Sequence, residues 1–419
     1  MRILKGKAAE GYVRKLERRG SRLEEVEPAV RMIVQGVRKN GDRALRKYAT
    51  RFDGLAPAES LRIRESELRK AWKSAASPLK SSLQIAAKNI RQFCDWQKPT
   101  EWVRSAHGIS LGQMVRPLDS VGCYVPGGRF PLVSTLLMTV IPAQVAGVKN
   151  IRVVSPRPSD EVLTAAAMLG VNEFYRVGGA QAIAALAYGT KTIPRVDKIV
   201  GPGNLYVTAA KKIVSFDCAI DMLAGPTEVV IVSLRGNARF IASDLVAQAE
   251  HDPETLGVFI TTSEKLGNEV ATAFKKGGPE APSLHDNAIG IASLKKRGAV
   301  LIANTKQQAF VWANRIAPEH ITVEKEDLNF VQNAGSIFVG DYSAQAAGDY
   351  ASGPNHVLPT AGAARFRGGL SVLDFVKLIT VQEISSRALS RLAPAIVQLA
   401  ETEGLRAHAE SIRVRCASA

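Results

Sequence analysis

The sequence has 419 residues, of which 46% are hydrophobic and 22% are charged, with 34 glycines. This balance is typical of globular proteins and excludes a collagen-like or intrinsically disordered chain. At about 150 residues per domain, the length predicts two or three domains with a large buried core. No apolar run approaches the roughly 20 residues that span a bilayer. Residues 1–11 lack the apolar segment of a signal peptide, so we expect a cytoplasmic protein without a membrane partner.

The formal net charge of +16 is concentrated in the first hundred residues. That segment holds 24 Lys and Arg against 11 Asp and Glu, whereas the rest of the chain holds 31 against 28. The basic residues are spread over amphipathic helical patterns instead of forming one block, which favours a solvated helix surface over a nucleic-acid-binding face. We therefore expect no nucleic-acid partner.

Four cysteines, Cys94, Cys123, Cys218 and Cys416, are scattered along the chain without CxxC spacing. This pattern indicates neither a disulfide framework nor a cysteine-rich zinc site. We expect these thiols to be small buried groups.

The first hundred residues are predicted to be helical. Ser21 and Glu24 have the spacing of a capping box, and valine and isoleucine recur at helical intervals up to Gly41. A second apolar stripe over residues 83–93 predicts another amphipathic helix. A short strand is expected near Val121.

Short β-branched segments then alternate with helical patterns as far as residue 340. Such alternation is typical of parallel sheets covered by helices on both faces, with ligands at the carboxyl ends of the strands. From about Asp374 the chain is predicted to be helical without a strand. The predicted strands lie at 151–154, 174–177, 198–200, 228–232, 257–261, 299–303 and 336–340.

The predicted fold class is therefore α/β, with two Rossmann-like parallel-sheet domains that lack a GxGxxG fingerprint. A helical N-terminal region and a helical C-terminal tail complete it. Changes in the pattern of strands and helices along the chain give the predicted domain boundaries. The expected units are an N-terminal helical arm (1–20), a discontinuous first α/β domain (21–120 and 228–373), a second α/β domain (121–227) and a helical tail (374–419).

Three glycine-rich turns, at 124–128, 177–182 and 201–204, lie where a predicted strand ends and a helix begins. Backbone N–H groups at such turns can meet phosphate oxygens. Taken singly, each segment is more simply an ordinary turn.

The segment 243–252 is predicted to be a helix that places Gln248 and His251 three residues apart on one face. A metal ion could be held there, and Asp244, Gln248 and Glu250 are all possible partners of His251. The simpler interpretation is a helix terminus with a histidine near the negative end of the dipole. The segment alone slightly favours that interpretation.

Glu319 and His320 follow a helix that ends before Pro318. Both side chains can transfer protons near neutral pH, and adjacent residues point apart, so the pair could serve two successive proton transfers. A polar helix stop is about equally consistent with these residues alone.

Two further segments carry histidine and carboxylate residues. Asp349 and His356 lie in a glycine- and proline-rich loop that has the features of a functional loop on a rigid sheet, although an ordinary turn is the alternative. Glu403 and His408, near the end of the chain, are most simply part of a solvated helix.

Considered together, the motifs resemble those of the histidinol dehydrogenase family. They are DMLAGPTEV (221–229), SDLVAQAEHD (243–252), APEH (317–320), GDYASGPNHVLPT (348–360) and EGLRAH (403–408). The resemblance covers nearly the whole chain, because it also includes GDRALRKYATRFDG (41–54) and the three glycine-rich turns.

The resemblance implies a zinc- and NAD-dependent dehydrogenase and assigns roles to individual residues. The implied zinc ligands are Gln248, His251, Asp349 and His408, and the implied acid/base pair is Glu319 and His320. The implied NAD contacts are Tyr124, Gln181 and Asn204. The implied substrate contacts are Thr227, His356 and Glu403, together with the zinc ligands and His320.

The implied reaction oxidises L-histidinol through L-histidinaldehyde to L-histidine, the last step of histidine biosynthesis, with two successive hydride transfers to NAD. His320 would take the alcohol proton, Glu319 would activate water, and His320 would deprotonate the hydrate. The resemblance also implies a homodimer in which the C-terminal tail brings Glu403 and His408 to the partner's site.

Three other interpretations stay open at this point. Related zinc-dependent NAD dehydrogenases that act on other small alcohols or diols, such as a sulfonated propanediol, are similar over the zinc site, although Glu403 and His356 favour histidinol. A zinc hydrolase could use the same ligands with Glu319 as base and would not need NAD. A basic nucleic-acid-binding protein would lose affinity steeply with salt.

Overall fold

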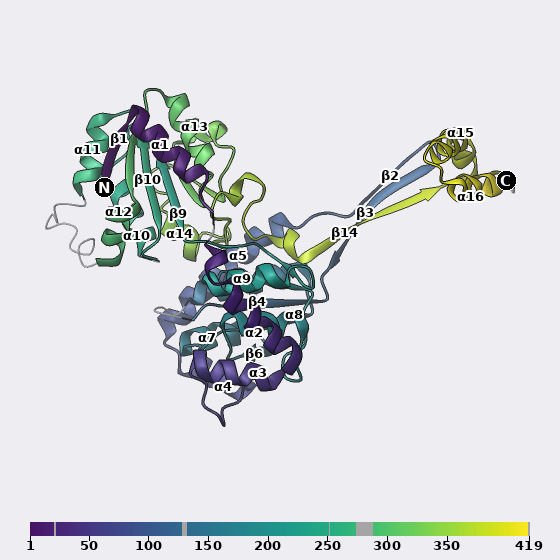
Figure 1. Ribbon diagram of the computed structural model, residues 1–419, viewed down its shortest axis with the longest axis horizontal. Coiled ribbons are helices and arrows are strands. Elements are labelled where there is room, and N and C mark those ends of the chain that lie inside the picture. The colour runs from purple at the N-terminus through teal and green to yellow at the C-terminus, as the bar shows by residue number, and fades with distance from the viewer. Residues whose placement is uncertain (21, 128–131, 251, 274–287, 418–419) are drawn as a thin grey trace.

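The computed structural model describes the chain except for residues 21, 128–131, 251, 274–287 and 418–419. Two parallel sheets, each covered by helices, form the body, and an antiparallel ladder extends away from them (Figure 1). This arrangement confirms the predicted α/β class with two parallel-sheet units. Among the described residues, no helix combines the length and the apolar character needed to cross a bilayer.

The first sheet has six parallel strands in the order β1-β11-β10-β9-β12-β13. They are β1 (Arg2–Lys5), β9 (Glu228–Val232), β10 (Leu256–Thr261), β11 (Ala299–Ile302), β12 (His320–Val323) and β13 (Ser336–Val339). Every residue of β9, β10 and β11 is buried, as expected for central strands covered on both faces.

Helices cover both faces of this sheet and bury a separate core on each. One core includes residues of α1 (Gly6–Glu17) and α13 (Lys306–Ile316). The other includes residues of α10 (Ala238–Ala249), α11 (Glu264–Ala273) and α12 (Ala288–Arg297). Helix α14 (Gln345–Tyr350) contacts α10, and short 3-10 helices lie at η4 (Lys325–Phe330), η5 (Ala363–Arg365) and η6 (Val372–Phe375).

The second sheet has five parallel strands in the order β6-β5-β4-β7-β8. They are β4 (Ser120–Tyr124), β5 (Asn150–Val154), β6 (Glu173–Tyr175), β7 (Lys198–Val200) and β8 (Ala219–Ile220). Counted from β4, this is the 3-2-1-4-5 order of a nucleotide-binding Rossmann sheet. Its helices are α6 (Val133–Ala146), α7 (Asp160–Met168), α8 (Gly179–Tyr188) and α9 (Leu205–Val214).

The N-terminal helices pack on the second sheet and not on the first, which differs from the prediction that residues 21–120 belong to the first domain. Helix α2 contacts α8 and α9, α4 contacts α7, and α5 contacts α6. An amphipathic pattern shows that a helix has a buried face but does not identify the surface that covers it. The helices are η1 (Leu23–Glu25), α2 (Glu27–Asn40), α3 (Asp42–Tyr48), η2 (Ala49–Asp53), α4 (Glu65–Ser74) and α5 (Ser77–Gln97). Ser21 of the predicted capping box lies outside the described residues.

The C-terminal tail contains a strand, so the prediction of a purely helical tail from Asp374 is wrong. Strand β14 (Val376–Ile384) pairs antiparallel with β3 (Ile109–Pro117), which also pairs with β2 (Trp102–Ala106). Most residues of β14 are exposed, so the strand lacks the alternation that marks a half-buried strand. The ladder carries α15 (Ser386–Thr402) and α16 (Arg406–Ala417) far from both sheets (Figure 1).

Candidate active site

The predicted catalytic residues gather at the amino edge of the first sheet. His320 is the first residue of β12, and Thr227 directly precedes β9. Gln248 near the end of α10 donates to Asp349 of α14 (Nε2 to Oδ2, 2.7 Å), and Asp349 faces His320, so both side chains belong to the same cluster. These residues therefore lie at the opposite edge from the carboxyl ends of strands, where the sequence predicts ligands. The turns after β4, β6 and β7 of the second sheet do lie at carboxyl ends.

Residues 221–227 connect the carboxyl end of β8 to the amino end of β9, and thus link the edges of the two sheets. Side chains from the loop that carries the predicted substrate contacts cross the same boundary. The Nε2 atom of His356 lies 3.3 Å from Oγ1 of Thr135 on α6, and the amide of Asn355 donates to the carbonyl of Met138 on the same helix at 2.6 Å. The amino edge of one sheet and the carboxyl edge of the other therefore meet.

Glu319 and His320 are both buried and both contact the backbone of Glu228. The N–H of Glu228 donates to Oε2 of Glu319 at 2.9 Å, and Nδ1 of His320 lies 3.3 Å from the carbonyl oxygen of Glu228. The Nε2 atom of His320 has no hydrogen-bond partner among the described residues, and the nearest carboxylate oxygen, Oδ1 of Asp349, is 3.6 Å away. If Nδ1 carries the proton and donates to the carbonyl, Nε2 is left as the basic atom.

Burial and the charges of neighbouring side chains shift the pKa values of Glu319, His320 and Asp349. Burial raises the pKa of Glu319 to about 8, because desolvation disfavours the carboxylate. Burial alone would lower the pKa of His320, but the carboxylates of Glu319 and Asp349 outweigh it and raise the pKa. The same histidine, together with the Gln248 amide, lowers the pKa of Asp349 against the effect of burial. A cluster of shifted groups in one place is typical of a proton-transfer site.

The predicted zinc ligands are brought together only in part. Gln248 and Asp349 are buried and adjacent, and both offer an oxygen that zinc can bind. The Gln248 amide directs its nitrogen to Asp349. To bind a metal ion beside Asp349, the amide would have to rotate and present its oxygen instead. His251 lies outside the described residues, and in the described part of the chain no cluster of three or more His, Cys, Asp or Glu could hold a metal.

The two tail residues do not reach the cluster within one chain. Glu403 ends α15 and His408 lies in α16, and both are exposed on the extended tail (Figure 1). Thr227 and His356 lie at the cluster and are partly buried. The Nδ1 atom of His356 is 2.8 Å from the carbonyl oxygen of Asp349, which fixes the ring beside the predicted ligand.

The three predicted NAD contacts lie at the carboxyl edge of the second sheet. The hydroxyl of Tyr124 accepts from the N–H of Gly179 at 3.1 Å, and burial raises its pKa to about 12. Gln181 is buried and donates through Nε2 to Oδ2 of Asp53 at 3.0 Å. Asn204 caps α9 by accepting from the N–H of Val207 at 3.1 Å. All three side chains thus hold the turns in place.

Several residues at the site were not predicted from their own patterns. Asp53 accepts from Gly178 and Gln181, each at 3.0 Å, although its segment, residues 41–54, is one of those that resemble the family. Glu228 lies within the family motif at residues 221–229, but nothing in its own pattern marks it. Arg19, which binds Glu228, has no local signal because the two residues are 209 positions apart.

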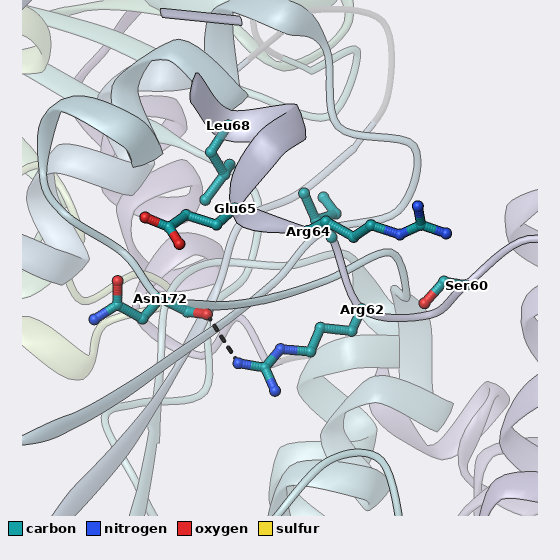
Figure 2. Close-up of a pocket in the computed structure, with 7 residues that line it drawn as sticks. Ser60, Arg62, Arg64, Glu65, Leu68 and Asn172 are labelled. Atoms are coloured by element: carbon teal, nitrogen blue, oxygen red, sulfur yellow. Dashed lines mark hydrogen bonds between the residues drawn. The ribbon is translucent and has the colours of Figure 1, made fainter. Parts of the chain in front are cut away.

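A surface cavity of about 390 Å³ lies elsewhere, beside the start of α4 (Figure 2). Arg62 crosses it and donates to the carbonyl of Asn172 at 3.2 Å. Its lining residues are Ser60, Arg62, Ile63, Arg64, Glu65, Leu68 and Asn172, which include no predicted site residue. The candidate site therefore rests on the cluster at the two sheet edges and not on this cavity.

Known proteins resemble this chain over nearly its whole length. A family model described as histidinol dehydrogenase matches residues 16–416. The histidinol dehydrogenase of Methanosarcina mazei is 45% identical, with 97% of this chain and 96% of that protein aligned. The one from Methanothermobacter thermautotrophicus is 46% identical, with 91% and 92% aligned. The crystal structure of histidinol dehydrogenase from Elizabethkingia anophelis superposes with a TM-score of 0.93 at 33% identity and covers 100% of this chain and 98% of that one.

Proposed function

The chain belongs to the histidinol dehydrogenase family, a family of NAD-dependent oxidoreductases, and from this premise we propose the reaction and the residues that perform it. It oxidises L-histidinol through L-histidinaldehyde to L-histidine, with two hydride transfers to NAD. The observation that carries this proposal is the buried cluster of Glu319, His320, Asp349 and Gln248 at the residues that the family motifs mark. Because the relatives are dehydrogenases, the family favours oxidation over hydrolysis or nucleic-acid binding.

His320 acts as the base in the first oxidation. Its Nδ1 faces the Glu228 carbonyl, so Nε2 is the atom that receives the proton of the substrate hydroxyl as the hydride leaves. The raised pKa of His320 makes the ring a better proton acceptor. The ring is held by the backbone of β9 and lies near Phe338, with the ring centroids 5.8 Å apart, so its orientation is set before substrate binds.

Glu319 acts between the two oxidations. Its carboxyl group is buried, and burial raises its pKa to about 8, so a carboxylate formed there is a strong base for a carboxyl group. It removes a proton from the water that adds to the aldehyde. His320 releases its first proton to solvent and then takes a proton from the resulting hydrate as the second hydride leaves. Two bases on adjacent residues can thus serve two positions of the substrate in turn.

Zinc and NAD would supply a metal anchor for the substrate and a hydride acceptor, which side chains do not provide. Zinc would be held by Gln248, His251 and Asp349, with His408 of the partner subunit, and would anchor and orient the substrate, while NAD would accept the hydride. The buried, adjacent side chains of Gln248 and Asp349 support this assignment. NAD would contact Tyr124, Gln181 and Asn204, and Thr227 and His356 would contact the substrate.

A homodimer would bring the tail to the site. The tail exposes large apolar side chains on its ladder and its helices, among them Leu378, Ile379 and Leu399, at 50%, 45% and 64% exposure. Such a surface favours burial against another chain. A second copy would also supply Glu403 and His408, which one chain leaves far from its own cluster (Figure 1).

The reaction is tested by the yield of NADH from limiting L-histidinol with the zinc-replete protein. Two NADH per substrate, with histidine as product, is the expected result. A chelator should abolish turnover, and added zinc should restore it. Absence of NADH from histidinol would contradict the substrate, and activity on another small alcohol or diol would identify the related dehydrogenase instead.

The dimer is tested by mixing two inactive variants. His320→Asn and His408→Ala each disable a site, but if the tail crosses, a mixed dimer contains one site with no substitution. Random exchange of subunits should then restore about a quarter of the wild-type activity, because half of the dimers are mixed and each has one intact site. No recovery after demonstrated exchange would show that each site takes its histidine from its own chain.

A further inference from the structure

A buried ion pair joins the N-terminal helix to the candidate active site. Arg19, two residues after α1, donates from Nε to Oε1 of Glu228 and from Nη2 to Oε2, both at 2.6 Å. The side chains of Arg19 and Glu228 are only 16% and 5% exposed. A two-point contact between guanidinium and carboxylate fixes direction as well as distance.

Glu228 holds the catalytic pair through its backbone. Its N–H donates to the Glu319 carboxyl group at 2.9 Å, and its carbonyl oxygen is 3.3 Å from Nδ1 of His320. One residue therefore receives Arg19 with its side chain and orients both proton-transfer groups with its main chain. A shift of Glu228 would change the position of both groups together.

The same ion pair contacts two strained residues beside the site. Ala317 and Ala361 have left-handed φ values of 48° and 53°, which cost energy for residues other than glycine. Arg19 donates to the carbonyl of Ala317 at 3.5 Å, and the N–H of Ala361 donates to Oε1 of Glu228 at 3.0 Å. Ala317 begins the segment that carries Glu319, and Ala361 follows the loop that carries His356.

Helix α1 is itself anchored to α13, the helix that leads into residues 317–320. Arg315 donates to Glu10 at 2.7 Å and to Glu17 at 2.8 Å, and the Trp312 indole donates to Glu10 at 2.9 Å. Arg19 is therefore held from the side of α1 and cannot follow Glu228 freely. The N-terminal helix acts as a fixed support for the start of β9.

We propose that Arg19 is a positioning residue for the oxidation, which it serves by holding Glu228 and through it Glu319 and His320. This proposal rests on the proposed function, because it takes these two residues as the proton-transfer groups. It also gives one residue of the basic N-terminal segment a defined role. The role concerns the chemical step and not the binding of NAD, whose predicted contacts lie on the other sheet.

The test compares Arg19→Met with Arg18→Met in the full-length, zinc-replete protein. Arg18 is the exposed neighbour and provides the matched control. Arg19→Met is expected to lower kcat by about 10- to 100-fold, the usual effect of removing a residue that supports a catalytic group. The KM values for NAD and histidinol and the zinc content should stay close to wild type. Arg18→Met should match wild type in every measurement.

Arg19→Lys and the double variant Arg19→Met/Glu228→Gln separate positioning from folding. Lysine keeps the charge but makes only one of the two contacts, so kcat should recover in part. The double variant removes the buried unpaired carboxylate and should regain thermal stability while kcat stays low. Recovery of kcat to wild type in the double variant would overturn the proposal, since charge and not geometry would then explain the loss.

Two other results would also decide whether Arg19 positions the proton-transfer groups. A lower Tm for Arg19→Met with unchanged kcat well below that Tm would show a purely structural role and overturn the proposal alone. A wild-type protein that forms no NADH from histidinol would overturn the proposed function, and the positioning role of Arg19 with it.

Discussion

The two sheet edges that meet at the candidate site differ in how their polar groups are satisfied. At the amino edge of the first sheet, Nε2 of His320 is buried without a hydrogen-bond partner among the described residues, and the Glu319 carboxyl has a raised pKa. At the carboxyl edge of the second sheet, buried carboxylates accept the turn N–H groups. Under the proposed function, this difference separates a reacting edge, which would keep atoms available for substrate protons, from a rigid supporting edge.

The supporting edge uses two carboxylates in the same way. Asp53 accepts the N–H of Gly178 at 3.0 Å, and Asp221 accepts that of Gly201 at 2.7 Å. The next N–H, of Gly179, donates to Tyr124. A phosphate that approached these two N–H groups would therefore meet the Asp53 carboxylate and the Tyr124 hydroxyl, which already accept from them. We expect the cofactor phosphates to lie away from that turn, against the simplest interpretation of its glycines.

The largest expected effect is at the reacting edge. His320→Asn removes the proposed base, and kcat should fall by about 10²- to 10⁴-fold for both oxidations. Steady-state NADH formation from histidinol and from the aldehyde measures the two steps, and metal analysis should show unchanged zinc. His107→Asn is the control, since His107 is exposed and its left-handed φ of 52° suits asparagine. Turnover of His320→Asn within twofold of wild type would contradict the assignment.

The next effect is at the supporting edge and concerns stability. Lys211 is 2% exposed, forms an ion pair with Asp221 and donates to the carbonyl of Gly201 at 2.6 Å. Lys211→Met should lower the free energy of unfolding by about 3–5 kcal/mol, because it leaves a buried charge unpaired. Denaturant unfolding at pH 7 measures this loss.

The neighbouring lysine gives the matched control for that measurement. Lys212 is 45% exposed and pairs with Glu27 at 2.8 Å. Lys212→Met should change the free energy of unfolding by no more than about 1 kcal/mol, as for other surface ion pairs. Equal losses in the two variants would show that the turn at Gly201 does not depend on the buried pair.

A smaller effect should separate cofactor binding from substrate binding. Asp53→Ala leaves the N–H of Gly178 and the Gln181 amide without their acceptor, which should lower the free energy of unfolding by about 1–3 kcal/mol. Because both groups belong to the turn that carries a proposed NAD contact, the KM for NAD should rise while the KM for histidinol stays unchanged. Asp95→Ala, at an exposed position on α5, is the control. A rise in the KM for histidinol alone would contradict the division between the edges.

Most of the buried strands of the two parallel sheets were predictable from sequence. Alternating apolar segments predicted the strands of both parallel sheets except β1, β8 and β12. The same reasoning missed β2 and β3 and assigned the residues of β14 to a helical tail. Most residues of β14 and every residue of β2 are exposed, so these strands lack an apolar pattern. It also could not assign residues 27–97 to the second sheet, since the pattern of a helix face does not name its partner.

For the site, motifs identified residues that carry chemistry but not those that support them. Glu319 and His320 are adjacent in sequence, and a short pattern could mark them. Arg19 and Glu228 are 209 positions apart, and Asp53 and Gln181 are 128 apart, so each pair is defined only when a sheet and the helices that cover it have assembled. The edge of the first sheet was also misjudged, because the general preference for carboxyl ends does not follow from local sequence.

The smallest expected effect concerns Asp244, one helical turn before Gln248 on α10 and an alternative partner of His251. Burial raises the pKa of Asp244 to about 6, above the unfolded value of 3.8, so the folded state disfavours the carboxylate. This cost is absent below pH 3.8 and complete above about pH 6, so wild type loses stability as pH rises through that window.

Asp244→Asn removes this cost without removing the polar side chain. Two pKa units correspond to about 3 kcal/mol, and partial exposure of the side chain reduces the expected gain to about 1 kcal/mol at pH 7. Unfolding measured at pH 4.5 and pH 7.5 should show the advantage of the variant growing with pH. Zinc should be retained, because Gln248 and Asp349 are the proposed ligands. Loss of zinc with a loss of stability would instead make Asp244 a ligand, and its carboxylate would then belong to the reacting edge.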